Sequence, residues 1–247
     1  MHLWNLFTRK HKEVRRSHPE PEFLSKSTTY IVLGFGFDAR SNDYKIVRIL
    51  HHPYGHHPRF GEIYSLNTDS WRSLDCEVPA FSRYSSVVFL NGNLHWFAFN
   101  CRDVSDEDRN GCIVLFDVAG EVFDEMALPE EICRGRRGSE VYLAVFNDLL
   151  AVLTSVMHAT VDGERCSICS VWLMREYGVP KSWTKLYTFK VCGLVAGFDG
   201  VTKNGELLME IEVGERVSWN PVTQQLAYLP LSMQCDLVTV IESLVSL

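Results

Sequence analysis

The segment between His51 and Pro58 is the part of the sequence whose composition best suits metal binding. It contains four histidines, at positions 51, 52, 56 and 57, and neutral imidazoles are common ligands of zinc and copper. An evolved site also needs carboxylates or carbonyl oxygens that orient the rings, and this segment contains no acidic residue. The composition therefore favours adventitious binding, and we predict neither a metal site nor a cofactor.

Cys166 and Cys169 are the only two cysteines with metal-like spacing. No second pair accompanies them, and they lie in a segment that reads as a strand, where residues three apart point to opposite faces. The eight cysteines among 247 residues fall well below the roughly 8–10% of a disulfide scaffold. We expect reduced, buried thiols, with Cys112, Cys169 and Cys192 inside apolar runs.

The overall composition excludes several classes of protein. With 46% hydrophobic and 22% charged residues, the chain can bury a sizeable core. Its 24 basic and 31 acidic residues leave a net charge of −7, which disfavours nucleic acid and anionic membranes as partners. The longest apolar region, Val141–Met157, is interrupted by Asn147 and Asp148, and no secretory signal precedes it. We expect an intracellular protein, cytoplasmic or nuclear.

Short apolar segments followed by tight turns recur with a period of about fifty residues, the spacing of a propeller repeat. The first segment of each unit is Tyr30–Gly36, Ser86–Leu90, Tyr142–Phe146 or Leu194–Phe198. Each unit reads as four antiparallel strands, which predicts an all-β, kelch-like β-propeller. We expect blades at about 30–75, 85–128, 141–190 and 194–230. Because Ser86–Leu90 is continuously apolar, we expect neighbouring blades to cover both faces of that strand.

The two ends of the chain suggest a further, split blade. Trp4-Asn5-x-x-Thr8 matches Trp219-Asn220-x-x-Thr223, so the chain begins at the third strand of a blade. The apolar segment Leu237–Val245 is placed to complete it. The prediction is thus one domain over 1–247, with four full blades and an incomplete one formed by 1–16 and 236–247.

Aromatic residues recur near the outer hairpins, at Trp71, Phe123, Trp183 and Tyr228. Their regular position favours blade-to-blade packing over ligand stacking.

Several motifs occur in a fixed order along the chain: Gly34-Phe35-Gly36-Phe37-Asp38, Asn42-Asp43-Tyr44-Lys45-Ile46-Val47-Arg48, Ile63-Tyr64-Ser65-Leu66-Asn67-Thr68-Asp69-Ser70-Trp71-Arg72, Leu90-Asn91-Gly92-Asn93-Leu94-His95-Trp96, Val171-Trp172-Leu173-Met174-Arg175-Glu176-Tyr177-Gly178-Val179 with Ser182-Trp183-Thr184-Lys185, and Glu242-Ser243-Leu244-Val245-Ser246. This ordered set resembles the F-box-associated domain of plant F-box proteins. The resemblance implies a substrate receptor of a Skp-cullin-F-box ubiquitin ligase, which binds a target protein for ubiquitination. The Skp-type adaptor and cullin are implied as partners only where an F-box is present in a longer form. A decoy or regulatory binder without ligase coupling is the alternative.

The long polar connections of the repeat indicate where a target would bind. In a four-stranded meander, the connections between strands two and three and between blades leave the same face, and long loops on a rigid scaffold often carry recognition. We predict protein-binding roles for His52, Tyr54, His57, Arg59, Asp106, Asp108, Arg134, Arg136 and Arg137.

Catalysis on such a propeller is the remote alternative. A glycoside-processing site would need paired carboxylates, whereas the inner strands carry Phe35, Val87 and Val145. Asp38 and Asp199 are more simply explained as turn residues, and no phosphate-binding loop or nucleophile elbow is present. We predict no enzymatic activity.

Overall fold

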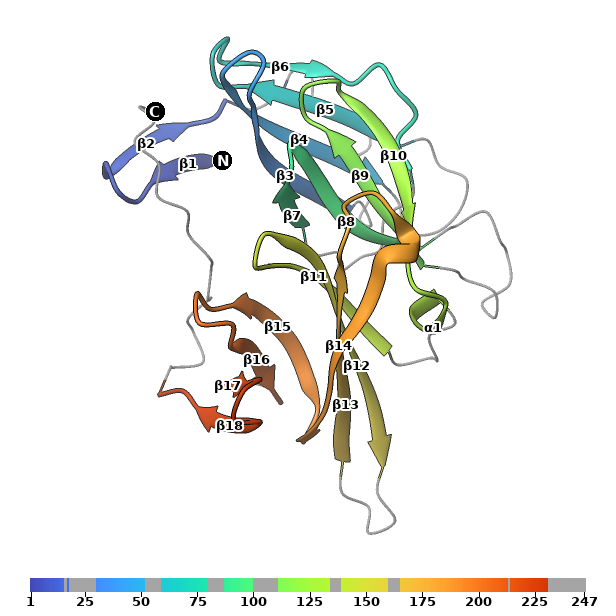
Figure 1. Ribbon diagram of the computed structural model, residues 1–247. Helices are drawn as coiled ribbons and strands as arrows, with labels where there is room; N and C mark the ends of the chain where they lie inside the picture. The colour runs from blue at the N-terminus through green and yellow to red at the C-terminus, as the bar shows by residue number, and fades with distance from the viewer. Residues whose placement is uncertain are drawn as a thin grey trace. The chain divides into compact units, whose positions relative to one another are not determined.

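The computed structural model describes residues 1–15, 17, 30–51, 59–79, 87–99, 111–133, 139–159, 165–212 and 214–230. Nearly all the regular structure of these residues is β-strand, arranged as four four-stranded antiparallel sheets and one two-stranded sheet (Figure 1). The described helices are the short α1 (Glu130–Cys133) and a 3-10 turn at Pro180–Ser182. This confirms the all-β prediction.

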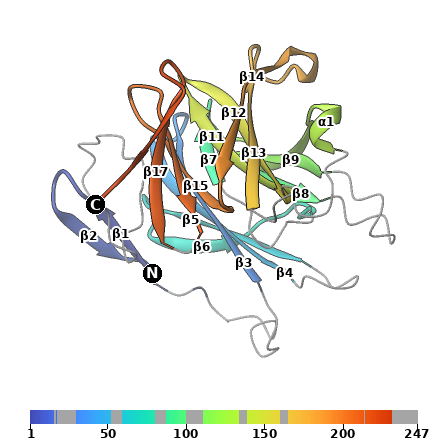
Figure 2. The ribbon, with the colours of Figure 1, turned by 90° about the horizontal axis from the view of Figure 1, so that it is seen from below.

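Each four-stranded sheet is a meander of consecutive strands, drawn as a twisted layer in Figures 1 and 2. Two compact units contain them, the first with β1 to β8 and most of β9 and β10, the second with β11 to β18. The strands of the first unit are β1 (His2–Asn5), β2 (Lys10–Glu13), β3 (Tyr30–Asp38), β4 (Asp43–His51), β5 (Phe60–Ser65), β6 (Ser70–Ser73), β7 (Val87–Leu90), β8 (Asn93–Phe99), β9 (Gly111–Asp117) and β10 (Val122–Ala127). Those of the second are β11 (Ser139–Phe146), β12 (Leu149–Ala159), β13 (Arg165–Met174), β14 (Trp183–Cys192), β15 (Val195–Val201), β16 (Leu207–Ile211), β17 (Glu215–Asn220) and β18 (Gln225–Tyr228).

The hairpins β1–β2, β9–β10 and β17–β18 are built in the same way. At the start of each turn, the side-chain oxygen of Asn5, Asp117 or Asn220 accepts hydrogen bonds from the backbone N–H groups two and three residues later. Such side-chain-to-backbone bonds replace ladder bonds where the chain reverses. The match between the Trp-Asn motifs of β1 and β17 therefore marks two equivalent turns.

The β5–β6 hairpin shares a second feature with these three. In each of the four turns, the last residue before the returning strand has a left-handed backbone, at Arg9, Asp69, Glu121 and Gln224, with φ between 50° and 58°. The returning strand therefore begins in the same register in each of these hairpins. Leu226 of β18 pairs with Trp219, as Trp71 of β6 pairs with Tyr64 and Trp183 of β14 pairs with Met174.

The tight turns predicted between the first and second strands are also present. Asn91 and Gly92 have φ of 50° and 77°, and Asn147 and Asp148 have φ of 49° and 59°. Two consecutive left-handed residues form the turn that best matches the twist of antiparallel strands. Asparagine, aspartate and glycine adopt this backbone at the least cost.

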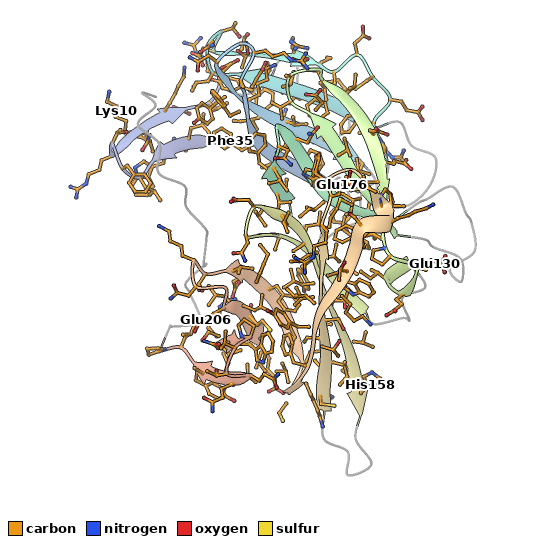
Figure 3. All side chains as sticks on the ribbon, in the orientation of Figure 1. Lys10, Phe35, Glu130, His158, Glu176 and Glu206 are labelled. Atoms are coloured by element: carbon orange, nitrogen blue, oxygen red, sulfur yellow. The ribbon has the colours of Figure 1, made fainter. Side chains whose placement is uncertain are left out.

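The inner strand β7 differs from the expectation that both of its faces are covered. Val87 and Phe89, which share one face, are 40% and 37% exposed. The neighbouring strand β3 likewise exposes Ile31, Leu33 and Phe35, the last labelled in Figure 3. The prediction was wrong because a run of apolar residues does not reveal whether both faces of a strand are packed.

The cysteines follow the sequence prediction in part. The described cysteines, Cys76, Cys112, Cys166, Cys169 and Cys192, are free thiols. Cys169 is fully buried in β13, and burial raises the pKa of its thiol to about 12, opposed by a hydrogen bond with Ser155. Cys192 is exposed at the end of β14, so its prediction as a buried thiol was wrong.

Within the described residues, no helix is long and apolar enough to cross a membrane.

Candidate functional site

Of the residues predicted to bind a partner, only Arg59 is among those that the structure describes. Its Nη1 donates a hydrogen bond to the backbone carbonyl of Val78 at 3.2 Å, which ties the start of β5 to the segment after β6. The other eight lie outside the described residues: His52, Tyr54, His57, Asp106, Asp108, Arg134, Arg136 and Arg137. The same holds for all of the histidine-rich segment except His51. In the part of the chain that is described, no three His, Cys, Asp or Glu side chains gather as metal ligands.

A buried ion network joins two sheets of the first unit. Lys45 Nζ lies 2.8 Å from Asp38 Oδ2, 2.9 Å from Glu121 Oε1 and 3.1 Å from the carbonyl of Val118. Glu121 also pairs with Arg72. Burial alone would raise the pKa of Asp38, but the hydrogen bonds from Lys45, from Ser41 and from two backbone N–H groups together lower it strongly. These charges hold strands together and are not free for chemistry.

Asp199 has a similar role in the second unit. The sequence suggested a turn residue, but Asp199 lies in β15, and both of its oxygens accept hydrogen bonds from Arg216 Nη1 at 2.6 and 2.7 Å. Glu210 Oε2 approaches the same nitrogen at 3.1 Å. The guanidinium therefore links β15, β16 and β17.

Two of the recurring tryptophans join neighbouring elements through their indole N–H groups. Trp71 Nε1 donates to the carbonyl of Arg15 at 2.7 Å, just after β2, and Trp183 Nε1 donates to the carbonyl of Ala127 at 3.1 Å, at the end of β10. This confirms that they pack between repeat units. Phe123 instead packs on Phe116 and Trp96 of its own sheet. Tyr228 is 71% exposed, so the packing role predicted for it was wrong.

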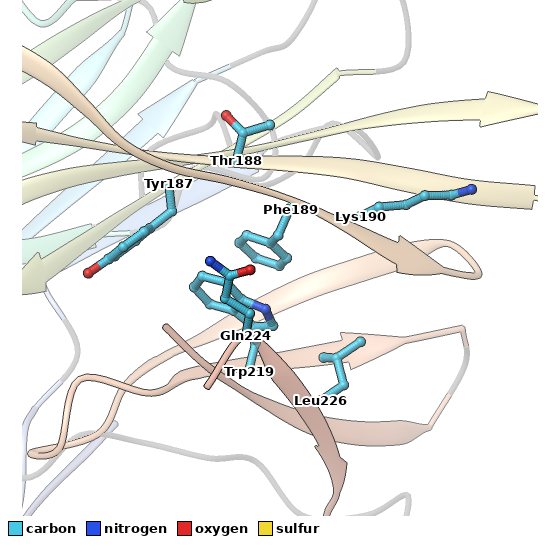
Figure 4. Close-up of a pocket in the computed structure, with 7 residues that line it drawn as sticks. All are labelled: Tyr187, Thr188, Phe189, Lys190, Trp219, Gln224 and Leu226. Atoms are coloured by element: carbon cyan, nitrogen blue, oxygen red, sulfur yellow. The ribbon is translucent and has the colours of Figure 1, made fainter. Parts of the chain in front are cut away.

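A groove of about 280 Å³ lies between β14 and the β17–β18 hairpin, within the second unit (Figure 4). It is lined by Tyr187, Thr188, Phe189, Lys190, Trp219, Gln224 and Leu226. Its aromatic wall is preorganised, because the rings of Phe189 and Trp219 stack with centroids 3.9 Å apart and an angle of 8°. The ring of Tyr187 meets Trp219 edge-on at 5.4 Å.

The open side of the groove carries polar and exposed groups. Figure 4 shows Phe189 projecting from β14 toward Trp219, with the Gln224 amide beside both rings and Leu226 farther along β18. Leu226 is 37% exposed. Four of the seven lining residues carry a polar group, Tyr187, Thr188, Lys190 and Gln224, so the groove combines an aromatic wall with hydrogen-bonding groups.

The sequence analysis did not identify this groove, because its walls come from strands about thirty residues apart that meet only in the fold. One signal was available. The position of Trp71 and Trp183 in the hairpin register is occupied by Leu226 in the last sheet. A smaller side chain at a repeated packing position indicates a junction that the described residues leave unfilled.

The sheets define an all-β protein built from repeated four-stranded meanders, and comparison with known proteins identifies the family. The family model of the F-box associated beta propeller domain matches residues 1–217. The chain therefore belongs to this family and has its β-propeller fold, which confirms the predicted fold class and the resemblance.

Several similar proteins come from Arabidopsis thaliana. F-box protein CPR1 is 26% identical over 190 residues, which cover 66% of this chain and 41% of that protein. An F-box/kelch-repeat protein is 27% identical over 190 residues, covering 75% of this chain and 46% of that protein. The chain thus spans less than half the length of these two relatives. Among solved structures, a hypothetical protein from Leishmania major aligns over 81% of this chain and 66% of its own, with 10% identity and a TM-score of 0.38.

Proposed function

We propose that this chain is a protein-recognition domain that binds a target protein for a Skp-cullin-F-box ubiquitin ligase. The observation that carries the proposal is the family match over residues 1–217, together with relatives named as F-box proteins. The Skp-type adaptor would be engaged by an F-box in a longer form of the protein, and the target by this domain. This function belongs inside the cell, where that ligase acts.

The described site residues support binding over catalysis. The buried carboxylates of Asp38 and Glu62 and the partly buried Asp199 are each held by a basic side chain. Ion pairs of this kind fix the geometry of a scaffold, so these three carboxylates are not available as general acids or bases. The proposed function therefore includes no chemical step in this domain.

Affinity capture from plant tissue, with and without a proteasome inhibitor, tests this function. The chain should enrich a specific protein whose recovery rises when degradation is blocked. The same target should be recovered without the Skp-type adaptor, because the two partners use different parts of the full receptor. Saturable capture of the target by the purified chain is the expected confirmation. The absence of any target in both conditions would contradict the proposal.

Charge reversal of the predicted loop residues is a second arm of that experiment. Replacing Arg134, Arg136 and Arg137 by glutamate should weaken capture, because like-charge repulsion then opposes an acidic patch on the partner. Unchanged capture would remove these arginines from the proposed surface.

A further inference from the structure

We propose that the groove between β14 and the β17–β18 hairpin receives a tryptophan side chain from an extended, acidic segment of the partner protein. The inference rests on the proposed function and deepens it, since it names the chemistry of the segment recognised. It follows from what fills the equivalent position elsewhere in this chain, from the aromatic wall of the groove, and from the local charge.

In two of the four four-stranded sheets the equivalent position holds a tryptophan, and in the β9–β10 hairpin it holds Phe123. Trp71 and Trp183 stand opposite Tyr64 and Met174 in their hairpins, and each indole N–H bonds to a backbone carbonyl of the preceding repeat unit. Leu226 stands opposite Trp219 in the same register. It is smaller than an indole and has no N–H to donate.

The carbonyl that would accept such a bond can be located by counting. Arg15 lies five residues after Lys10, the first residue of β2, and Ala127 lies five residues after Val122, the first residue of β10. Trp183 matches the second residue of β6, so the count on β14 starts one residue earlier, at Ser182, and reaches Tyr187. The irregular pairing opposite Val171 and Trp172 inserts one extra residue in β14, and counting it moves the position to Thr188. Both residues line the groove. Among the described side chains, none donates a hydrogen bond to either carbonyl.

The walls of the groove suit a flat aromatic guest. Trp71 packs on the ring of Tyr64, with centroids 5.4 Å apart, and on the Arg48 guanidinium at 5.1 Å. In the groove, Trp219 and the Phe189 ring stacked on it provide the corresponding apolar surface. Tryptophan is the side chain that combines a large apolar surface with a single N–H donor.

The charge of the β14 wall favours an acidic group in the partner segment. The described β13–β14 hairpin, residues 165–192, contains five basic residues and one acidic residue, whereas the described residues of the facing sheet, 195–228, include two basic and five acidic residues. Among the lining residues, Lys190 of β14 is the charged one, and it forms no ion pair with any other described residue. A carboxylate near the guest tryptophan would therefore find a cation at the rim.

The guest is expected to be extended because β14 is the edge strand of its sheet. It is ten residues long, and among the described strands it pairs only with β13. Edge strands present backbone N–H and C=O groups to which an extended peptide can add. Binding should then protect β14 amides from hydrogen exchange.

The test uses the full chain and a phage-displayed library of random linear peptides. Enriched peptides should contain a tryptophan close to aspartate or glutamate, and replacing that tryptophan by alanine in the synthetic peptide should abolish binding measured by fluorescence anisotropy. Hydrogen exchange should slow in β14 when the peptide is bound. Enrichment of peptides without an aromatic residue, or of none at all, would overturn the inference.

Two variants locate the binding in the groove. Leu226→Trp supplies the missing indole within the chain, so it should raise the melting temperature and weaken peptide binding by at least about tenfold. Lys190→Glu should weaken binding by about tenfold through charge reversal. The matched controls are Val222→Trp and Lys203→Glu, which make the same changes at exposed positions outside the groove and should bind like the unmodified chain.

The remaining outcomes also decide the matter. If Leu226→Trp lowers the melting temperature, Leu226→Arg takes its place as the groove variant, and full binding by both Leu226→Arg and Lys190→Glu would refute the site. Concentration-dependent dimers lost on Leu226→Arg would assign the groove to a second copy and overturn the partner assignment.

If the groove variants still capture the target protein, this inference fails while the proposed function stands. If peptides bind the groove but no target is captured, the groove stands as a peptide-binding site while the proposed function fails.

Discussion

At the scale of single residues, Lys45 illustrates how a charge becomes part of the core of a sheet protein. Its ammonium lies between Asp38 and Glu121 and is almost inaccessible, with 10% of its side chain exposed. Desolvation favours the neutral amine, but the two carboxylates favour the cation more and raise its pKa. The two ion pairs of Lys45 join β3 and β4 to the turn that precedes β10.

Replacing Lys45 by methionine should therefore destabilise the protein by about 3 kcal/mol, because the Asp38 carboxylate stays buried without its cation. Urea unfolding followed by circular dichroism measures the change. Lys203→Met, at an exposed turn, should shift the free energy of unfolding by less than about 0.5 kcal/mol. An equally small effect at Lys45 would show that the buried pair contributes little.

The same network predicts acid sensitivity with a defined sign. The pKa values of Asp38 and Glu121 are lowered in the folded state. Their stabilising contribution to the free energy of unfolding is therefore fully present above the unfolded pKa of about 4, and it is lost as the pH falls toward the folded pKa values. The raised pKa of Lys45 adds a contribution that is present at neutral pH and lost only above about pH 10.4.

Urea midpoints measured between about pH 6 and about pH 3 should thus fall less steeply for Asp38→Asn than for the unmodified chain. The variant starts from a lower stability, so the slope is the quantity compared. Parallel slopes would assign the acid sensitivity to other carboxylates.

At the scale of elements, the turns account for most of what the sequence predicted correctly. Asn91-Gly92 and Asn147-Asp148 have a composition that allows a left-handed backbone, so their hairpins follow from local chemistry alone. The coverage of β7 did not follow, because it depends on which strands lie against it. The groove at Leu226 escaped prediction for the same reason.

Gly92→Ala tests the local part of that argument. Gly92 has φ of 77°, and an added Cβ would meet no atom within 4 Å, so the change acts on the backbone conformation alone. We expect a loss of about 1 kcal/mol in the free energy of unfolding. Gly197→Ala is the control, because Gly197 lies outside the left-handed region and its added Cβ would lie 4.0 Å from the nearest atoms. Equal effects at both positions would argue against a conformational origin.

At the scale of the whole molecule, the repeat explains both the fold and the candidate site. Recurrent hairpins specify the sheets, and two tryptophans, Trp71 and Trp183, each bond to the preceding repeat unit. A departure from the repeat is then informative, because it marks a position where the described residues lack a contact that is present in other repeat units. The loop residues predicted from composition could not be placed in this way, since eight of the nine lie outside the described residues.

The split blade predicted from the sequence gives the last test. The β1–β2 sheet has two strands among the described residues, and a two-stranded hairpin is at best marginally stable by itself. The bond from Trp71 to Arg15 fastens one side of it. The apolar segment Leu237–Val245, which lies outside the described residues, is predicted to supply a further strand.

Ending the chain after Pro230 should then speed hydrogen exchange in His2–Glu13 and lower the melting temperature, with β12 and β13 little affected at low temperature. Val238→Ser with Val240→Ser should reproduce the effect in the full-length chain, because residues two apart share a face of a strand. Thr239→Ser with Ser243→Ala, on the alternate face, is the matched control. Unchanged exchange in the hairpin after truncation would show that the terminal segment does not complete this sheet, and the β1–β2 edge would need another partner.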